Sequence, residues 1–291
     1  MTAPQEITIE ELIAHYPVML LDAYGVLVNP SGALPGAAGL IDELNRTRKP
    51  YYLLTNDASK LPQTAANRYQ RYGLAIDPER IITSGGLLKN HFKIHNLSGA
   101  RCVVLGPDDS ARYVSDAGGK VVSPATGFDV VVIGDEAGFP FVETLDIILT
   151  ELFHKVERQE KIHLVLPNPD LIYPKADRAF GITSGSIALI FEAALQLRYP
   201  GRPGLCFKRL GKPNVEIFQE ALRRSGTRNM VMIGDQLETD IRGANTFGLA
   251  SVLVGTGITD PTTADLPDQP QPTYRMHAIG LRQRKSAKGD N

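Results

Sequence analysis

The stretch Met19-Leu20-Leu21-Asp22-Ala23-Tyr24-Gly25-Val26-Leu27 decides how the chain is expected to fold. It continues an apolar run over residues 18–21, which is typical of a strand buried on both faces of a parallel sheet. Asp22 follows this run directly. In an open parallel sheet, ligands bind beyond the carboxyl ends of the strands, so Asp22 is expected to project into a binding crevice. Taken alone, Asp22 is better explained as a turn cap, and the rest of the chain decides between the two roles.

Apolar strands and amphipathic helices alternate along the rest of the chain. A short helix is expected after Thr8, with Thr8 as its cap and Glu11 completing a capping box. The alternation predicts an α/β protein with a Rossmann-like, doubly wound parallel sheet. The pattern restarts near residue 97, and a Pro- and Gly-rich seam lies near residue 200. We therefore expect a core formed by residues 1–84 plus 206–291, with an inserted α/β cap domain over residues 85–205.

The composition is that of a globular protein without a strong charge bias. Of the 291 residues, 43% are apolar and 22% are charged, and the net charge is -1. Such a balance argues against broad electrostatic binding to nucleic acid or to an anionic membrane. No apolar run approaches the ~20 residues needed to span a bilayer, and residues 1–14 lack the apolar core of a signal peptide. We expect a cytoplasmic protein with neither a nucleic-acid nor a membrane partner.

Two further features complete this profile. Cys102 and Cys206 lie far apart and neither has a CxxC partner, which fits a reducing compartment and argues against a structural zinc site. The chain ends in a basic tail, which we expect to be a frayed and solvated terminus. Its basic residues are Arg282, Arg284, Lys285 and Lys288.

Polar residues of complementary kinds follow three of the expected buried strands. Asp22 follows the first, and Thr55 and Asn56 end the second. Asp235 ends a third, with Asp240 in the helix that comes next. Because the carboxyl ends of parallel strands meet at the same edge of a sheet, these side chains are expected to share one site.

This set of residues matches what phosphoryl transfer requires. The reaction needs a nucleophile, a divalent cation and hydrogen-bond donors around the phosphoryl oxygens. Mg²⁺ prefers an octahedron of hard oxygens supplied by carboxylates, water and the phosphate, and Asp22 and Asp235 can supply the carboxylates. The Thr55 hydroxyl, the Asn56 amide and the ammonium group of Lys212 can hold the phosphate.

Each of these residues also has a purely structural explanation. Thr55 and Asn56 could cap a helix expected over residues 58–72. Lys212 could be a solvated surface lysine. Asp235 and Asp240 could both favour the amino end of their helix through its dipole. These structural roles would have to occur independently at four successive strand or turn ends. One shared site explains all four more simply.

The ordered motifs resemble those of a known family. The segments that carry the resemblance are Asp22-x-Tyr24-Gly25-Val26, Leu54-Thr55-Asn56, Gly211-Lys212-Pro213 and Gly234-Asp235-x-x-x-x-Asp240. Together they resemble the four motifs of the haloacid dehalogenase-like (HAD) hydrolase superfamily. The insertion is similar to that of its class IIA branch, which is sugar-phosphatase and nitrophenyl-phosphatase-like, through Asn168-Pro169-Asp170-x-x-Tyr173-Pro174 and residues 185–194. The resemblance covers nearly the whole chain up to about residue 258.

The resemblance implies a Mg²⁺-dependent phosphohydrolase that acts on a small phosphorylated metabolite. It implies that Asp22 attacks phosphorus and forms an aspartyl-phosphate, with Lys212 as the second catalytic residue. It implies metal ligation by Asp22, the backbone carbonyl of Tyr24 and Asp235, while Asp240 binds the metal through water or orients Lys212. A cap that closes over the leaving group and a homodimer through that cap are also implied. The expected substrate-binding residues are Thr55, Asn56, Asp57, Asp170 and Tyr173.

Tyr24 departs from the family pattern. Most phosphatases of the superfamily carry a second Asp at this position, where it acts as general acid and base. A phenol, with a pKa near ~10, is a poor substitute at neutral pH. Losing general acid–base help typically removes ~10²–10⁴ in rate.

Three hypotheses follow from this departure. The first is a phosphatase that is slow, selects good leaving groups, or borrows an acid from its cap, for which Asp170 and Tyr173 are the candidates. The second is a catalytically weakened protein that binds a phosphorylated metabolite. The third is a metal-free 2-haloacid dehalogenase-like hydrolase, whose first motif is similar to Asp-Ala-Tyr-Gly. Retention of both Asp235 and Asp240 counts against the third, because a metal-free site has little use for them.

Overall fold

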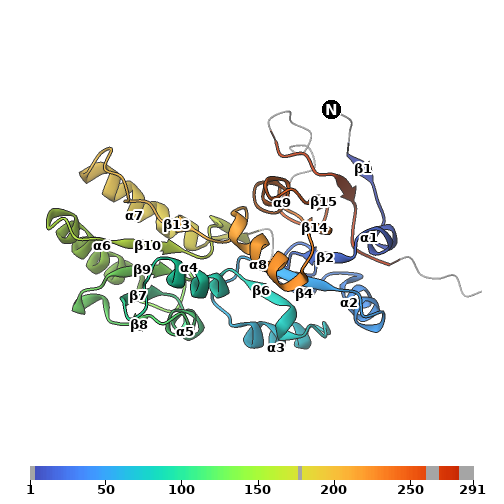
Figure 1. The fold of residues 1–291 in the computed structure, drawn as a ribbon, viewed down its shortest axis with the longest axis horizontal. Helices are drawn as coiled ribbons and strands as arrows, with labels where there is room; N and C mark the ends of the chain where they lie inside the picture. The colour runs from blue at the N-terminus through green and yellow to red at the C-terminus, as the bar shows by residue number, and fades with distance from the viewer. Residues whose placement is uncertain (1–3, 176–178, 260–268, 282–291) are drawn as a thin grey trace, which may run out of the picture.

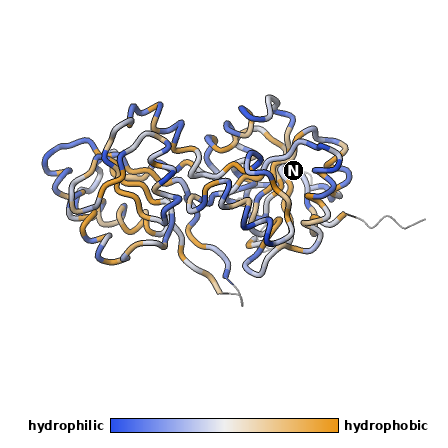
Figure 2. The backbone as a smooth tube through the Cα atoms, turned by 90° about the horizontal axis from the view of Figure 1, so that it is seen from below, coloured by the Kyte–Doolittle hydropathy of each residue, from blue (hydrophilic) through white to orange (hydrophobic). Residues whose placement is uncertain are grey.

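The computed structural model describes residues 4–175, 179–259 and 269–281. The basic tail from Arg282 lies outside these described residues. The described chain contains two parallel sheets that lie in separate lobes (Figure 1). In both lobes the apolar segments run through the interior and the polar segments lie outside, as Figure 2 shows.

The larger sheet is built from both ends of the described chain and has seven parallel strands. Their order is β1 (Gln5–Glu6), β16 (Tyr274–Met276), β15 (Ala250–Val254), β14 (Met230–Gly234), β2 (Val18–Leu21), β5 (Tyr51–Thr55) and β6 (Ile81–Thr83). The apolar run before Asp22 is therefore strand β2, between β14 and β5. Leu21 lies opposite Ile233 on one side and Leu53 on the other, so the three strands end at the same level.

Helices cover both faces of this sheet, which confirms the doubly wound α/β fold. Successive residues of a strand point to opposite faces, so Met19 and Leu21 pack on one side of β2, and Val18 and Leu20 on the other. The first face is covered by α1 (Ile9–His15), α2 (Ala37–Arg46) and α3 (Pro62–Arg71). The second face is covered by α4 (Leu88–Ile94), α8 (Val215–Ser225) and α9 (Arg242–Phe247).

The second sheet has five parallel strands, all from the middle of the chain. Their order is β13 (Lys208–Arg209), β10 (His163–Leu166), β9 (Val130–Ile133), β7 (Arg101–Leu105) and β8 (Lys120–Val121). One face packs on α6 (Phe141–Glu157) and α7 (Ser184–Arg198), and the other on α4 and α5 (Asp108–Asp116). An antiparallel hairpin of β11 (Ile172–Pro174) and β12 (Phe180–Ile182) precedes α7.

The edge strand β13 of this second sheet lies near one expected domain boundary. Lys208 and Arg209 pair with Val165 and Leu166, so the strand that precedes the return to the core still belongs to the middle sheet. The expected core segment over residues 206–291 would include this strand, and the domain boundary stays a prediction. We propose to treat residues 85–209 as the cap and the remainder as the core, and we use both names in this sense below.

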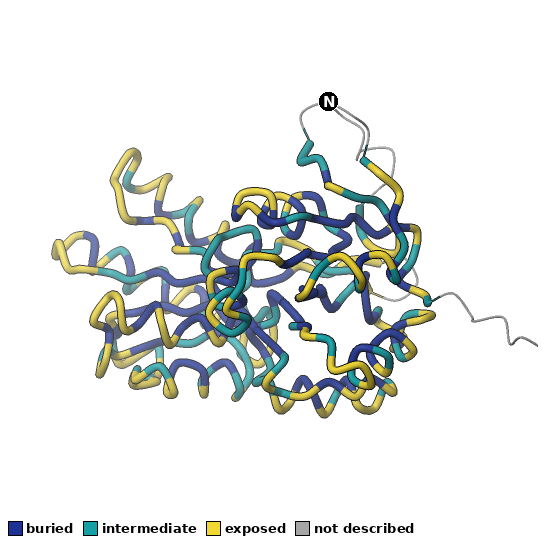
Figure 3. Tube along the Cα trace, turned by 45° about the vertical axis from the view of Figure 1, so that its right-hand side comes forward, coloured by how far each residue is buried: buried dark blue, intermediate teal, exposed yellow. Residues whose placement is uncertain are grey.

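One apolar cluster joins the core to the cap. It contains Leu20 and Leu54 of the core sheet together with Val130 and Val132 of the cap sheet, and Phe92 of α4 is buried among them. Figure 3 shows buried segments in both parts of the molecule. Within the described residues, no helix combines the length and the apolar character needed to cross a membrane.

Candidate active site

Core and cap together line a cavity of about 690 Å³ at the carboxyl ends of β2, β5 and β14. Asp22, Thr55 and Asp235 reach it from those three strand ends, and Lys212 reaches it from the loop that precedes α8. Asp170 and Tyr173 reach it from the cap. The structure therefore brings residues far apart in sequence around one space, and their individual roles remain predictions.

Lys212 lies at the centre of a buried charge cluster. Its Nζ donates to Asp22 Oδ1 at 2.6 Å and to Asp240 Oδ1 at 2.7 Å, and its side chain is 3% exposed. Burial works against the charged ammonium, but the two carboxylates outweigh it and raise the pKa of Lys212 above its usual value. This burial excludes the explanation of Lys212 as a solvated surface lysine.

The charge of Asp22 depends on the cations beside it. Burial raises the pKa of Asp22 to about 7, the Lys212 ammonium opposes this, and the Asp240 carboxylate adds to it. A nucleophilic carboxylate must be ionised. A second positive charge next to Asp22 would therefore favour the reactive form.

Asp235 has a buried carboxylate oxygen without a hydrogen-bond partner, and this is the clearest indication of a cation site. Its Oδ2 accepts from the Ile258 amide at 2.8 Å, whereas its Oδ1 is buried with no hydrogen-bond partner. Burial raises the pKa of Asp235 well above its usual value, and the charges of Asp240 and Asp22 raise it further. A buried carboxylate oxygen without a partner is costly unless a bound group satisfies it.

The carboxylates around Asp235 can hold a divalent metal ion. Asp22, Asp235 and Asp240 each offer one oxygen, and these oxygens lie within 4.8 Å of one another. Three carboxylates face a single lysine, which leaves an excess of negative charge in a buried place. Hard oxygen ligands of this kind suit Mg²⁺, so the residues present fit the ion that the family resemblance implies.

Asp240 is placed to orient its neighbours. Its Oδ2 accepts from the backbone amides of Asp235 and Gln236 at 3.2 and 3.1 Å, and its Oδ1 accepts from Lys212. It is fully buried and does not line the cavity, unlike Asp22 and Asp235. Of the two roles considered for Asp240, orientation of Lys212 therefore has the more direct support.

Asn56 connects the lysine loop to the cap. Its Oδ1 accepts from the Lys212 amide at 2.7 Å, and its Nδ2 donates to the Lys212 carbonyl at 3.0 Å and to Asp170 Oδ1 at 2.8 Å. Its side-chain amide therefore makes three hydrogen bonds, two within the core and one across to the cap. Burial raises the pKa of Asp170 to about 6, because the ammonium of Lys212 and the hydrogen bond from Asn56 only partly offset it.

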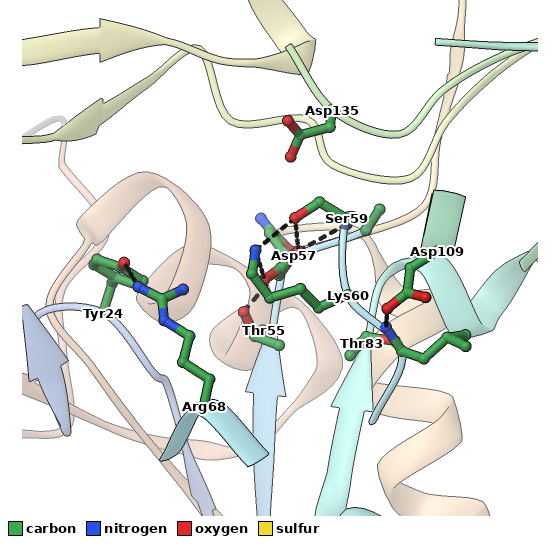
Figure 4. Close-up of polar contacts among 12 residues, drawn as sticks. Tyr24, Thr55, Asp57, Ser59, Lys60, Arg68, Thr83, Asp109 and Asp135 are labelled. Carbon is green, nitrogen blue, oxygen red and sulfur yellow. Dashed lines mark hydrogen bonds and ion pairs between the residues drawn. The ribbon is translucent and has the colours of Figure 1, made fainter. Parts of the chain in front are cut away.

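The explanation of Thr55 and Asn56 as helix caps is wrong. Helix α3 begins at Pro62 with Leu61 as its cap residue, four residues later than the expected start at residue 58. The intervening loop is held by Asp57, whose Oδ1 accepts from the amide and the hydroxyl of Ser59, each at 2.7 Å (Figure 4). The Thr55 hydroxyl accepts from the Asp57 amide at 3.2 Å and lines the cavity.

Several cavity residues were not predicted from the sequence. Gly257 and Ile258 follow β15 and enclose Asp235, and the glycine-rich turn after a buried strand was the signal that could have revealed them. Arg68 of α3 donates to the Tyr24 hydroxyl (Figure 4). Nothing in the sequence distinguishes this arginine from its neighbour Arg71.

Comparison with known proteins agrees with the geometry. Residues 19–120 match the family model described as haloacid dehalogenase-like hydrolase, and residues 209–279 match a second one described as HAD-hydrolase-like. A dihydroxyacetone phosphatase from Corynebacterium glutamicum is 28% identical over 89% of this chain and 88% of its own length. An acid sugar phosphatase from Staphylococcus haemolyticus is 26% identical over 92% of this chain and 95% of its own.

A solved structure extends the similarity to three dimensions. The crystal structure of a possible sugar phosphatase of the HAD superfamily from Cytophaga hutchinsonii superposes with a TM-score of 0.81 and 29% identity. The superposition covers 96% of this chain and all of that one, so cap and core are both included. The chain belongs to the haloacid dehalogenase-like hydrolases, in the class IIA branch of sugar-phosphatase and nitrophenyl-phosphatase-like enzymes.

Proposed function

We propose that this protein is a Mg²⁺-dependent phosphohydrolase that acts on a small phosphorylated metabolite through an aspartyl-phosphate intermediate. One observation carries the proposal: the carboxylate of Asp22, at the central strand end, lies against Lys212 and within 4.8 Å of oxygens of Asp235 and Asp240. The relatives named as dihydroxyacetone and acid sugar phosphatases support a small phosphate ester as the substrate.

In the first step, Asp22 attacks phosphorus and the bond between phosphorus and the ester oxygen breaks. Lys212 and the Thr55 hydroxyl stabilise the negative charge of the phosphoryl oxygens, while the Asn56 side chain, whose two N–H groups are already bound, holds the Lys212 loop in place. When bound, Mg²⁺ would neutralise further charge there, with Asp22, the Tyr24 carbonyl and Asp235 as its proposed ligands. In the second step, water attacks the aspartyl-phosphate, releases phosphate and restores the Asp22 carboxylate.

We assign the missing acid–base role to Asp170. It lines the cavity from the cap, and its pKa of about 6 lets it exist in both protonation states near neutral pH. The protonated carboxyl would donate to the leaving oxygen in the first step, and the carboxylate would accept the proton of the attacking water in the second. Tyr173, the other candidate, also lines the cavity.

The proposal also includes the compartment, the partners and the oligomeric state of the protein. The balanced net charge of -1 supports an enzyme with no nucleic-acid or membrane partner, and two cysteines without a CxxC partner support the reducing conditions of the cytoplasm. A homodimer through the cap is supported by large apolar side chains that the cap leaves exposed. Those of the hairpin and of α7 are Ile172, Phe180, Ile182, Leu189, Ile190 and Leu197.

Phosphate and chloride release separate the proposed function from its alternatives. The protein is incubated with Mg²⁺ and either a panel of phosphate esters or 2-chloropropionate, beside the variants Asp22→Asn and Asp42→Asn. Asp42 is exposed on α2 and serves as the matched control. We expect phosphate release that EDTA and Asp22→Asn each abolish and that Asp42→Asn leaves unchanged. Chloride release insensitive to EDTA would establish the dehalogenase alternative, and tight ligand binding without turnover would establish the binding protein.

A further inference from the structure

Arg68 lines the same cavity as Asp22, at the side where Tyr24 lies. It belongs to α3 and is partly buried, and its guanidinium points toward the Tyr24 side chain in Figure 4. Its Cζ lies 5.4 Å from the centre of the Tyr24 ring and 5.7 Å from that of Tyr72. The guanidinium is therefore fixed between two aromatic rings beside the proposed phosphate site.

The hydrogen bonds of Arg68 position its charge without neutralising it. Nη2 donates to the Tyr24 hydroxyl, and Nε donates to the Tyr72 hydroxyl at 3.3 Å. Both acceptors are tyrosine hydroxyls, and no carboxylate of the described chain forms an ion pair with Arg68. A guanidinium has five N–H donors, so at least three have no acceptor among the described residues.

The other cations of the cavity differ in this respect. Among the described lining residues the cations are Lys60, Arg68 and Lys212. Lys212 is bound by Asp22 and Asp240, and Lys60 lies 3.3 Å from the carboxylate of Asp57. Arg68 is thus the cation of this lining that keeps its full charge for a ligand.

We propose that Arg68 binds a second anionic group of the substrate, distinct from the phosphoryl group that Asp22 attacks. This inference rests on the proposed phosphatase function. The planar fork of arginine binds a carboxylate or a phosphate through two parallel hydrogen bonds, so the substrate class is a phosphate ester that carries one of these groups. Tyr24 then has a role of its own: its hydroxyl holds the guanidinium in place where an aspartate would partly neutralise it.

Matched substrate pairs test the role of Arg68. For a carboxylate, 3-phosphoglycerate is compared with glycerol 3-phosphate, and for a second phosphate, fructose 1,6-bisphosphate is compared with fructose 6-phosphate. We expect Arg68→Gln to lower kcat/KM about 10- to 100-fold for the doubly anionic member of at least one pair, and less than about 3-fold for its partner. Arg68→Lys should recover part of the loss. Arg71→Gln, an exposed position on the same helix, should change neither member.

The ratio of kcat/KM between the two members of a substrate pair distinguishes a loss of substrate recognition from a loss of folded protein. An equal loss for both members, or no loss for either, would overturn the proposal, whatever the melting temperature of the variant. If the wild-type protein releases phosphate from no ester, the proposed function fails while Arg68 stays testable. Calorimetric titration with phosphonoacetate and with methylphosphonate, in the presence of Mg²⁺, then replaces turnover. A preference for phosphonoacetate that Arg68→Gln removes would support the role of Arg68, and its absence would exclude it.

Discussion

Backbone atoms hold Asp235 closely, and two glycines make this approach possible. A Cβ added to Gly257 would lie 1.8 Å from Asp235 Oδ2, and one added to Gly25 would lie 2.4 Å from the same oxygen. Neither distance is compatible with a real side chain. The acidic residue at the end of β14 therefore keeps its position because its neighbours have no side chains.

Substitution of Gly257 should consequently disable the metal site. We expect Gly257→Ala to displace Asp235, to lower kcat by more than about 10²-fold and to raise the Mg²⁺ concentration needed for half-maximal activity. Gly255→Ala is the matched control, because its Cβ would meet nothing closer than 3.4 Å. Steady-state rates over a Mg²⁺ titration measure both effects. Equal Mg²⁺ dependence in the two variants would show that Asp235 is not a ligand.

Tyr24 gives the second prediction at this scale. Because Asp170 is the proposed acid, we expect Tyr24→Asp to give no selective gain in turnover of alkyl phosphates, which need a proton on the leaving oxygen, over that of aryl phosphates. The comparison is made by measuring kcat for glycerol 3-phosphate and 4-nitrophenyl phosphate with both proteins. A selective gain for the alkyl ester would instead mean that position 24 limits the chemistry and that Asp170 does not supply the acid.

Among single residues, those at strand ends were the ones that could be placed from the sequence. Asp22 and Asp235 each follow a buried apolar run that predicts a parallel strand. Because such strands end at one edge of the sheet, the residue after each run is expected at that edge. Arg68 could not be placed in this way, because its contact with Tyr24 depends on how α3 packs against the loop after β2. Local pattern carries no information about such packing.

Among elements, the strands were predicted more accurately than the start of α3. Strand β2 spans the four residues of its apolar run, and Thr8 forms the expected capping box with Glu11 at the start of α1. The loop before α3 is helical in pattern, but Asp57 binds Ser59 and delays the helix until Pro62. A side chain that bonds to nearby backbone competes with the helix, and periodicity does not reveal the outcome.

Helix α4 carries a titratable group that should make stability depend on pH. The pKa of His91 is lowered to about 4, mainly by burial and also by the nearby charges of His95, Lys208 and His163, whereas Glu216 opposes them. Between pH 6.5 and 4 the unfolded chain binds a proton at His91 that the folded protein does not. The stability that neutral His91 contributes is therefore complete above about pH 6.5 and is lost as the pH falls toward 4.

Thermal melting across this range tests the assignment. We expect the melting temperature of His91→Gln to fall less steeply than that of the wild type between pH 6.5 and 4. His154→Gln, on the exposed side of α6, is the control and should follow the wild-type slope. Parallel curves for all three proteins would show that His91 is not the group responsible.

For the whole molecule, the sequence predicts two α/β units but not how they join. The strand β13 and the hairpin of β11 and β12 are two or three residues long, too short for a periodic signal. The apolar cluster shared by core and cap contains residues as distant in the sequence as Leu20 and Val165. Such contacts arise from packing of complete elements, so they could only be observed in the folded structure.

Asp170 connects this large-scale arrangement to catalysis, because the cap brings it to Asn56 of the core. The substitution Asp170→Asn keeps an acceptor for Asn56 and removes only the titrating proton. We expect it to lower kcat for glycerol 3-phosphate by ~10²–10⁴, and that for 4-nitrophenyl phosphate by less than about 10-fold, since the aryl oxide leaves without protonation. Asp146→Asn, exposed on α6, should change neither rate.

The pH profile distinguishes an acid from a residue that merely joins the two lobes. With a pKa of about 6, the protonated form of Asp170 decreases as the pH rises. At saturating Mg²⁺, whose charge would keep Asp22 ionised, the wild-type kcat for the alkyl ester should therefore decline above about pH 6, by up to tenfold for each pH unit. In Asp170→Asn this decline should vanish, because no proton is left to lose. A variant that is slower yet keeps the wild-type decline would mean that Asp170 positions the cap and that another group supplies the proton.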